Sequence, residues 1–232
     1  MRGLFFVLYV MSIVVLFNKP YGVLCQFSPQ AGRRTLKDYL PQSEIYPAGR
    51  LDADSEGLVV LTADGALQHR ITDPAHKLSK TYLVQVEGVP TESALEQLRS
   101  GVALAGFTSR PAVARGIDAP SWLWVRAPAV RERRAIPTSW LEITLAEGKN
   151  RQVRRMTAAV GFPALRLIRY AISKWTIAGI DPGRWREIEV ATARAGPAHP
   201  RREQSVGDGR QPIRKSSVKG RAIPHPLKRK KQ

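Results

Sequence analysis

Short apolar runs recur along the first 190 residues and have the length and composition of β-strands. Residues 13–17 are continuously apolar and end shortly before Pro20, which is typical of a buried strand. Residues 80–86 alternate instead, with Tyr82, Val84 and Val86 on one face, as in a strand with one buried face. On this basis we expect strands at residues 13–17, 57–62, 80–86, 140–145, 165–170 and 188–190.

Three other segments carry apolar residues at helical spacing and have start and stop signals. Asp64 and Thr91 are expected to cap the first two helices, and Gly148 precedes the third. In each helix the apolar residues share one face, which comprises Leu67 and Ile71, then Leu95 and Leu98, then Val153, Met156 and Val160. Because strands and helices follow one another without a repeated βαβ unit, the pattern predicts an α+β fold.

The two ends of the chain differ from this pattern. Residues 1–12 form an apolar extension without a clear structural interpretation. The whole apolar run of residues 3–17 is shorter than the ~20 residues that span a bilayer, and it lacks a cleavage site for a signal peptide. Residues 191–232 hold 12 Lys and Arg, 2 acidic residues and five prolines without apolar periodicity. Such a segment buries too little apolar surface to fold, so we expect a disordered basic tail after a folded domain at residues 13–190.

Charge and cysteine content narrow the chemistry. The chain has a formal net charge of +18, which indicates a polyanionic partner, either nucleic acid or a membrane surface. Its one cysteine, Cys25, excludes an intramolecular disulfide framework and a multi-cysteine zinc site, and the four histidines have no metal-ligand spacing. Any catalysis must therefore come from carboxylates, hydroxyls, arginines and lysines, or from a cofactor.

The densest group of candidate catalytic residues is a turn at residues 49–58. Asp52, Asp54 and Glu56 alternate there ahead of Gly57, as at the start of a calcium-binding loop. The twelfth position of such a loop would be Ala63, which cannot bind calcium, so the turn is not an EF-hand. An aspartate on a turn before a buried strand either points into a cleft or caps the turn. The residues alone leave both interpretations open for Asp52.

Two further clusters have alternative interpretations. Four cations crowd the start of the third helix, where the helix dipole disfavours positive charge, so a carboxylate or phosphate is expected nearby: Lys149, Arg151, Arg154 and Arg155. The alternative is a solvated basic face. Trp122 and Trp124 are expected on one strand face, where they either pack in the core or stack on RNA.

Several motifs together resemble the RsuA branch of the pseudouridine synthases. The turn and strand at residues 49–62 resemble the catalytic signature of these enzymes. Four other stretches agree in order, at residues 16–24, 80–82, 147–156 and 165–169. The resemblance covers residues 13–190 and implies a mixed, mainly antiparallel central sheet flanked by helices. Most members of the branch carry an S4-like RNA-binding domain before the Asn-Lys-Pro strand. We expect no such domain in this chain, which makes it most similar to the short RluE-type subgroup.

The resemblance implies isomerisation of a uridine to pseudouridine in 23S ribosomal RNA, by base flipping and without a metal or other cofactor. Asp52 matches the catalytic carboxylate, which attacks C1′ of the nucleotide or removes a proton from C2′. Arg154 matches the basic residue expected to pair with that aspartate. Tyr82 matches the tyrosine that stacks on the target base and takes part in proton transfer, although the strand pattern alone favours a core aromatic.

The same resemblance implies substrate-binding roles. Arg50 matches the arginine that fills the space left by the flipped base, and Leu167 is expected beside the target base or as a plain core leucine. Three cations are left for the RNA phosphates: Lys149, Arg151 and Arg155.

The resulting expectation is a monomeric cytoplasmic enzyme without an obligatory protein partner, acting on 23S rRNA or on the assembling large ribosomal subunit. Two other functions fit the charge. The first is a non-catalytic RNA-binding or ribosome-assembly protein, and the second is a basic protein tethered to a membrane by residues 3–17.

Overall fold

The computed structural model describes residues 7–41, 44–76, 78–131 and 135–195. Its strands are β1 (Val7–Lys19), β2 (Tyr46–Pro47), β3 (Glu56–Thr62), β4 (Lys80–Glu87), β5 (Ala103–Leu104), β6 (Phe107–Thr108), β7 (Val113–Ile117), β8 (Thr138–Leu145), β9 (Ala164–Ile172), β10 (Trp175–Thr176) and β11 (Trp185–Ala195). Its helices are α1 (Gly65–Thr72), α2 (Glu92–Ser100) and α3 (Gln152–Ala159), with 3₁₀ turns at Leu36–Asp38 and Pro74–His76.

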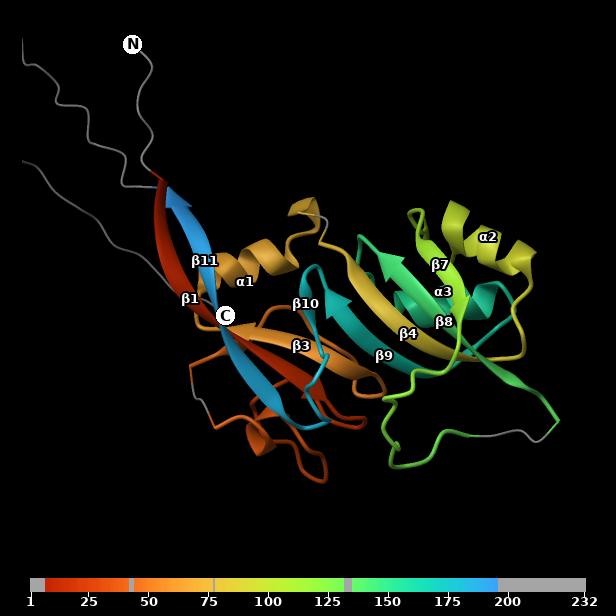
Figure 1. Cartoon of the computed structure of the whole chain (residues 1–232), viewed down its shortest axis with the longest axis horizontal. Helices are drawn as coiled ribbons and strands as arrows, with labels where there is room; N and C mark the ends of the chain where they lie inside the picture. The colour runs from red at the N-terminus through yellow and green to blue at the C-terminus, as the bar shows by residue number, and fades with distance from the viewer. Residues whose placement is uncertain (1–6, 42–43, 77, 132–134, 196–232) are drawn as a thin grey trace, which may run out of the picture. The chain divides into compact units, whose positions relative to one another are not determined.

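A nine-stranded sheet forms the centre of the fold (Figure 1). Its main order is β11-β1-β3-β9-β4-β8-β7, with β2 beside β3 and β10 beside β9. Among the described strands only β3 and β9 pair in parallel. The α+β fold with a mixed, mainly antiparallel sheet is therefore confirmed.

Helices cover the two ends of this sheet. Figure 1 shows α1 against β1, β3 and β11, and α2 and α3 near β4, β8 and β7. Asp64 caps α1 by accepting hydrogen bonds from two backbone amides, and Thr91 caps α2, as the sequence predicts. Tyr82, Val84 and Val86 share a core cluster with residues of α2 and α3, whereas Leu83 faces the opposite cluster. The alternation expected for residues 80–86 is thus confirmed.

The outer strands are longer than their local sequence suggests. β1 begins at Val7 and pairs antiparallel with β11 from Val7 opposite Ala195 to Phe17 opposite Trp185. Residues 7–12, which had no sequence interpretation, are thus part of the sheet. β11 also continues to Ala195, past the expected end of the folded domain at residue 190. The expected disordered tail otherwise lies outside the described residues. No helix within the described ranges is long and apolar enough to cross a membrane.

The prediction of a strand around Trp122 and Trp124 is wrong, because both residues lie in an irregular connection between β7 and β8. Trp124 packs against the core and donates a hydrogen bond from Nε1 to Glu56 Oε2 at 2.7 Å. Trp122 is 48% exposed and stacks on the Tyr170 ring, with 5.7 Å between the ring centroids. Core packing therefore describes Trp124 well and Trp122 only in part.

Candidate active site

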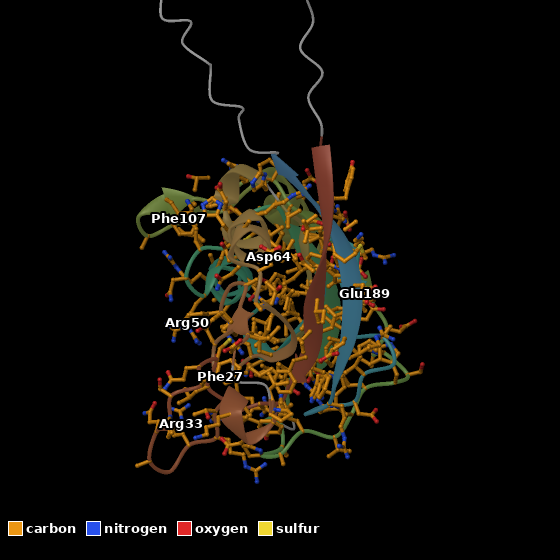
Figure 2. The ribbon with its side chains drawn as sticks, turned by 90° about the vertical axis from the view of Figure 1, so that its left-hand side faces the viewer. Phe27, Arg33, Arg50, Asp64, Phe107 and Glu189 are labelled. Carbon is orange, nitrogen blue, oxygen red and sulfur yellow. The ribbon has the colours of Figure 1, made fainter. Side chains whose placement is uncertain are left out.

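A cleft of about 620 Å³ opens on one side of the sheet. Its walls are the turn at residues 48–55, the end of α1, the segment at residues 145–153 and the start of β4, with parts of β9 below. Figure 2 shows Arg50 and Phe107 on the same side of the molecule, opposite Glu189 of β11. Six of the eight candidate residues from the sequence line the cleft: Arg50, Asp52, Tyr82, Lys149, Arg151 and Leu167.

The turn that carries Asp52 is held by the end of β1 and by the residues that follow it. The amide of Gly22 donates to the Ala53 carbonyl at 2.7 Å, and Lys19 Nζ approaches the same oxygen at 3.5 Å. After the turn, Gly57 has φ +103° and lies so close to β9 that a Cβ atom would be 2.4 Å from the Arg169 carbonyl oxygen. Glycine at this position therefore allows the close contact between β3 and β9. This contact fixes the preceding turn beside the cleft.

The two aspartates of the turn have different environments. The Asp52 side chain is 43% exposed and lines the cleft, and its contact with Arg151 is loose, at 3.6 Å from Nη1 to Oδ2. Asp54 is not among the cleft-lining residues and accepts two hydrogen bonds from Arg151, at 2.7 and 3.1 Å. Asp52 is consequently the carboxylate that is open to a ligand.

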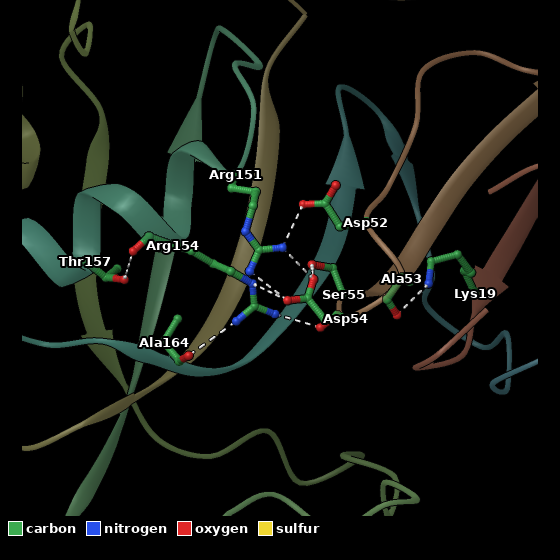
Figure 3. A network of polar contacts seen from close by, with 9 residues as sticks. All are labelled: Lys19, Asp52, Ala53, Asp54, Ser55, Arg151, Arg154, Thr157 and Ala164. Atoms are coloured by element: carbon green, nitrogen blue, oxygen red, sulfur yellow. Dashed lines mark hydrogen bonds and ion pairs between the residues drawn. The ribbon is translucent and has the colours of Figure 1, made fainter. Parts of the chain in front are cut away.

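The expected ion pair between Asp52 and Arg154 is replaced by another arrangement (Figure 3). Arg154 donates from Nη2 to the Asp54 carbonyl at 2.6 Å, and its Nε lies 3.5 Å from Asp54 Oδ2. Its side chain is 14% exposed, because it lies one helical turn below the rim, where it also reaches the Ala164 carbonyl. Arg151, at the N-cap of α3, is the arginine that meets Asp52.

These contacts set the protonation of Asp54. Burial by itself raises the pKa of this carboxyl group, but the hydrogen bonds from Arg151 and the charge of Arg154 outweigh that effect. The pKa of Asp54 is therefore held below its ordinary value. In turn, burial lowers the pKa of Arg154, against the attraction of Asp54.

The floor of the cleft combines apolar and aromatic side chains. Tyr82 is 8% exposed and lies on β4 directly opposite Arg169 of β9. Leu167, two residues earlier on β9, is 5% exposed and also lines the cleft. Both side chains belong to the core cluster below α3. Each of these two side chains therefore packs in the core and also lines the cleft.

The remaining candidate cations divide between the rim and the β5–β6 hairpin. Lys149 Nζ lies 3.7 Å from the centre of the Phe107 ring, and Arg155 stacks on the same ring and donates to the Ala105 carbonyl. Arg155 does not line the cleft, and neither does Arg154. The Arg50 side chain is exposed and has no polar partner among the described residues.

Two buried ionic groups near the site were missed in the sequence. Lys19 is fully buried, and its Nζ donates to the Pro20 and Val23 carbonyls at 3.0 and 2.9 Å. Desolvation lowers its pKa to about 8. Glu56 accepts two hydrogen bonds from Arg166, at 2.8 and 2.9 Å, and both residues are buried. The sequence signal that could have identified these residues is a charged side chain within or next to an apolar strand, because a buried charge needs a partner.

Known proteins are similar to this chain over most of its length. A family model described as RNA pseudouridylate synthase matches residues 13–159. The chain is 55% identical over 192 residues to ribosomal large subunit pseudouridine synthase E of Xanthomonas axonopodis pv. citri, covering 82% of this chain and all of that protein. It is also 55% identical over 177 residues to the protein of the same name from Vibrio parahaemolyticus, covering 76% and 74%. A crystal structure of a pseudouridylate synthase, 28% identical, superposes with a TM-score of 0.63 over 78% of this chain and 71% of that one.

Proposed function

Since this chain belongs to the RNA pseudouridylate synthase family, and is an enzyme that converts uridine in RNA to pseudouridine, we propose that its substrate is one uridine of 23S ribosomal RNA. The relatives that are 55% identical are named as enzymes of the large ribosomal subunit. The observation that supports this proposal most directly is the cleft, which is lined by an accessible Asp52 together with Tyr82 and Leu167. Its arginine-rich rim suits a polyanionic substrate.

Asp52 supplies the reacting carboxylate in this proposal. Pseudouridine formation breaks the N1–C1′ bond, rotates the base and rejoins it through C5. Whether Asp52 bonds to C1′ or takes a proton from C2′, it must be ionised and reachable by the ribose. Its 43% exposure leaves it reachable, and the Arg151 guanidinium places a positive charge 3.6 Å away.

Arg154 is then a positioning residue that acts through Asp54. It joins α3 to the turn by its bond to the Asp54 carbonyl, two residues from Asp52. Together with Arg151 it engages Asp54 and leaves Asp52 open to the substrate. In place of the ion pair expected between Asp52 and Arg154, both arginines contact Asp54 and so support the turn.

The floor and rim receive the substrate. A uridine must leave its base stack before its glycosidic bond can be reached, so the base enters the cleft and stacks on Tyr82 beside Leu167. Arg50, exposed beside the opening, fills the place of the extruded base. In this proposal Lys149, Arg151 and Arg155 bind the flanking phosphates. The enzyme is further proposed to act as a monomer in the cytoplasm, where its RNA substrate is made.

Carbodiimide mapping of pseudouridine in 23S rRNA tests the proposal. RNA from cells that lack this protein should miss one modified position, and expression of the wild-type chain should restore it. An unchanged modification pattern in the deletion strain would overturn the proposed substrate. If the purified chain bound this RNA tightly but restored no modification, a non-catalytic RNA-binding role would be favoured.

A further inference from the structure

Two cations at the cleft floor are not used by the functions assigned so far. Lys80 lies at the start of β4 and Arg169 on β9, and both line the cleft. Among the described residues no carboxylate lies within 4.0 Å of either side-chain nitrogen group. Uncompensated charge in a partly enclosed site is unfavourable, so its presence points to a ligand that carries negative charge.

The Lys80 side chain is held in the cleft. β4 and β8 pair in regular register, so Lys80 and Tyr82, two residues apart, face the same side of the sheet. A Cβ atom on Gly148 would lie 3.7 Å from Lys80 Cε, so the backbone there covers the lysine stem. Its Nζ donates to the Leu78 carbonyl at 3.0 Å. An ammonium group has three hydrogens, and this is its one hydrogen bond among the described residues.

Arg169 adds a second positive charge beneath the base position. It is 4% exposed, and it donates from Nε to the Leu58 carbonyl at 2.8 Å and from Nη1 to the Arg50 carbonyl at 3.2 Å. Its Nη2 is buried without a hydrogen-bond partner among the described residues. Burial, and after it the charge of Arg169, lower the pKa of Lys80. The two cations therefore repel each other at the cleft floor.

The reaction itself produces a negative charge that these two cations could stabilise. When the N1–C1′ bond breaks, its electron pair leaves with the base, while Asp52 bonds to C1′ or accepts the C2′ proton. The base becomes a uracil anion, whose charge is shared by N1, O2 and O4. If the base is stacked on Tyr82 as proposed, this anion forms on the side of the sheet that Lys80 also faces.

We propose that Lys80 donates a hydrogen bond to the departing uracil anion and thereby accelerates N1–C1′ cleavage, with Arg169 contributing its charge from below. This inference rests on the proposed function, because it requires a uridine stacked on Tyr82. A hydrogen-bond donor that stabilises charge developing in the transition state raises the rate of the chemical step. It has a smaller effect on the binding of the neutral base.

Single-turnover kinetics of Lys80→Met on a 23S rRNA fragment that the wild type modifies test this role. The rate of pseudouridine formation should fall about 10- to 100-fold, and the Kd for the RNA should change less than about threefold. Lys80→Arg, which keeps a positive charge, should recover most of the rate. Lys174→Met, in the exposed turn between β9 and β10, is the matched control and should leave both quantities unchanged.

Three outcomes would overturn the role of Lys80. They are a wild-type rate for Lys80→Met, equal losses for Lys80→Met and Lys80→Arg with both variants folded by circular dichroism, or a loss confined to RNA affinity, which would indicate a phosphate contact. Each is distinct from failure of the proposed function, in which the wild-type chain itself would form no pseudouridine in the RNA.

Discussion

The two aspartates of the turn at residues 48–55 show how contacts separate residues that look equivalent in sequence. Asp52 and Asp54 are two positions apart and both meet Arg151. Only Asp54 also meets Arg154, because the arginine one turn into α3 lies under the turn and not at its mouth. In the proposed mechanism, therefore, Asp52 carries out the chemistry and Asp54 supports the turn.

Asp54→Asn should destabilise the fold. The amide loses the charge that both arginines face, and we expect the free energy of unfolding to fall by about 1–2 kcal/mol at pH 7, a value between those of exposed and buried ion pairs. Because the folded pKa of Asp54 is lowered, its contribution is present above the ordinary carboxyl pKa and is lost as pH falls through the folded value. Urea denaturation of both proteins between pH 7 and pH 3 should therefore show the difference shrinking in acid. A constant difference would contradict the ion-pair assignment.

Lys19 should affect stability at the alkaline end of the pH range. Its folded pKa of about 8 lies below the ordinary value of 10.5, so between these values the folded chain releases a proton that the unfolded chain keeps. Stability relative to Lys19→Met should therefore rise as pH increases from about 8 to 10.5, by about 3 kcal/mol. Urea denaturation of both proteins across this range measures the trend. A flat difference would show that Lys19 titrates normally.

At the scale of elements, local patterns predict most of the sheet and helices but not the partners of each strand. The caps at Asp64 and Thr91 and the alternation of β4 are encoded within a few residues, and they are confirmed. The full length of β1 could not be predicted, because its first residues are stabilised by β11, at the far end of the folded chain. The pairing of arginines with aspartates likewise depends on how α3 meets the turn before β3.

The ion pair between Glu56 and Arg166 joins β3 to β9 where these strands run parallel. Arg166→Met should leave Glu56 buried without its ion-pair partner, although Trp124 still donates to it, and should lower the free energy of unfolding by about 3–5 kcal/mol. The double variant Glu56→Gln with Arg166→Met should recover part of that loss, since no buried charge remains. Thermal melting of the wild type, the two single variants and the double variant measures this coupling. Additive losses would contradict a direct ion pair.

At the scale of the whole molecule, the net charge of +18 has two parts. Residues 191–232 carry +10 of it, and the rest of the chain carries +8, including the cations around the cleft. The tail is expected to add affinity for RNA without specificity, whereas the proposed role of the cleft is to select the base.

Deletion of residues 196–232 tests this division and spares β11, which ends at Ala195. The dependence of log K for RNA on log salt should become shallower, by about 0.7–0.9 for each phosphate that the tail neutralises in the full chain. The single-turnover rate at saturating enzyme should stay within about twofold of the full chain, because the catalytic turn and the cleft are intact. An unchanged salt slope would show that the tail does not bind phosphate.

The central claim is that Asp52 in this cleft performs pseudouridine formation, and the single-turnover rate of Asp52→Asn on 23S rRNA tests it most directly. We predict that the wild type and the exposed-site control Asp118→Asn form pseudouridine at the same rate. Asp52→Asn should be slower by at least about 1,000-fold, or about 4 kcal/mol of barrier, with RNA affinity retained. A folded Asp52→Asn protein that works within about tenfold of the wild type would contradict the assignment.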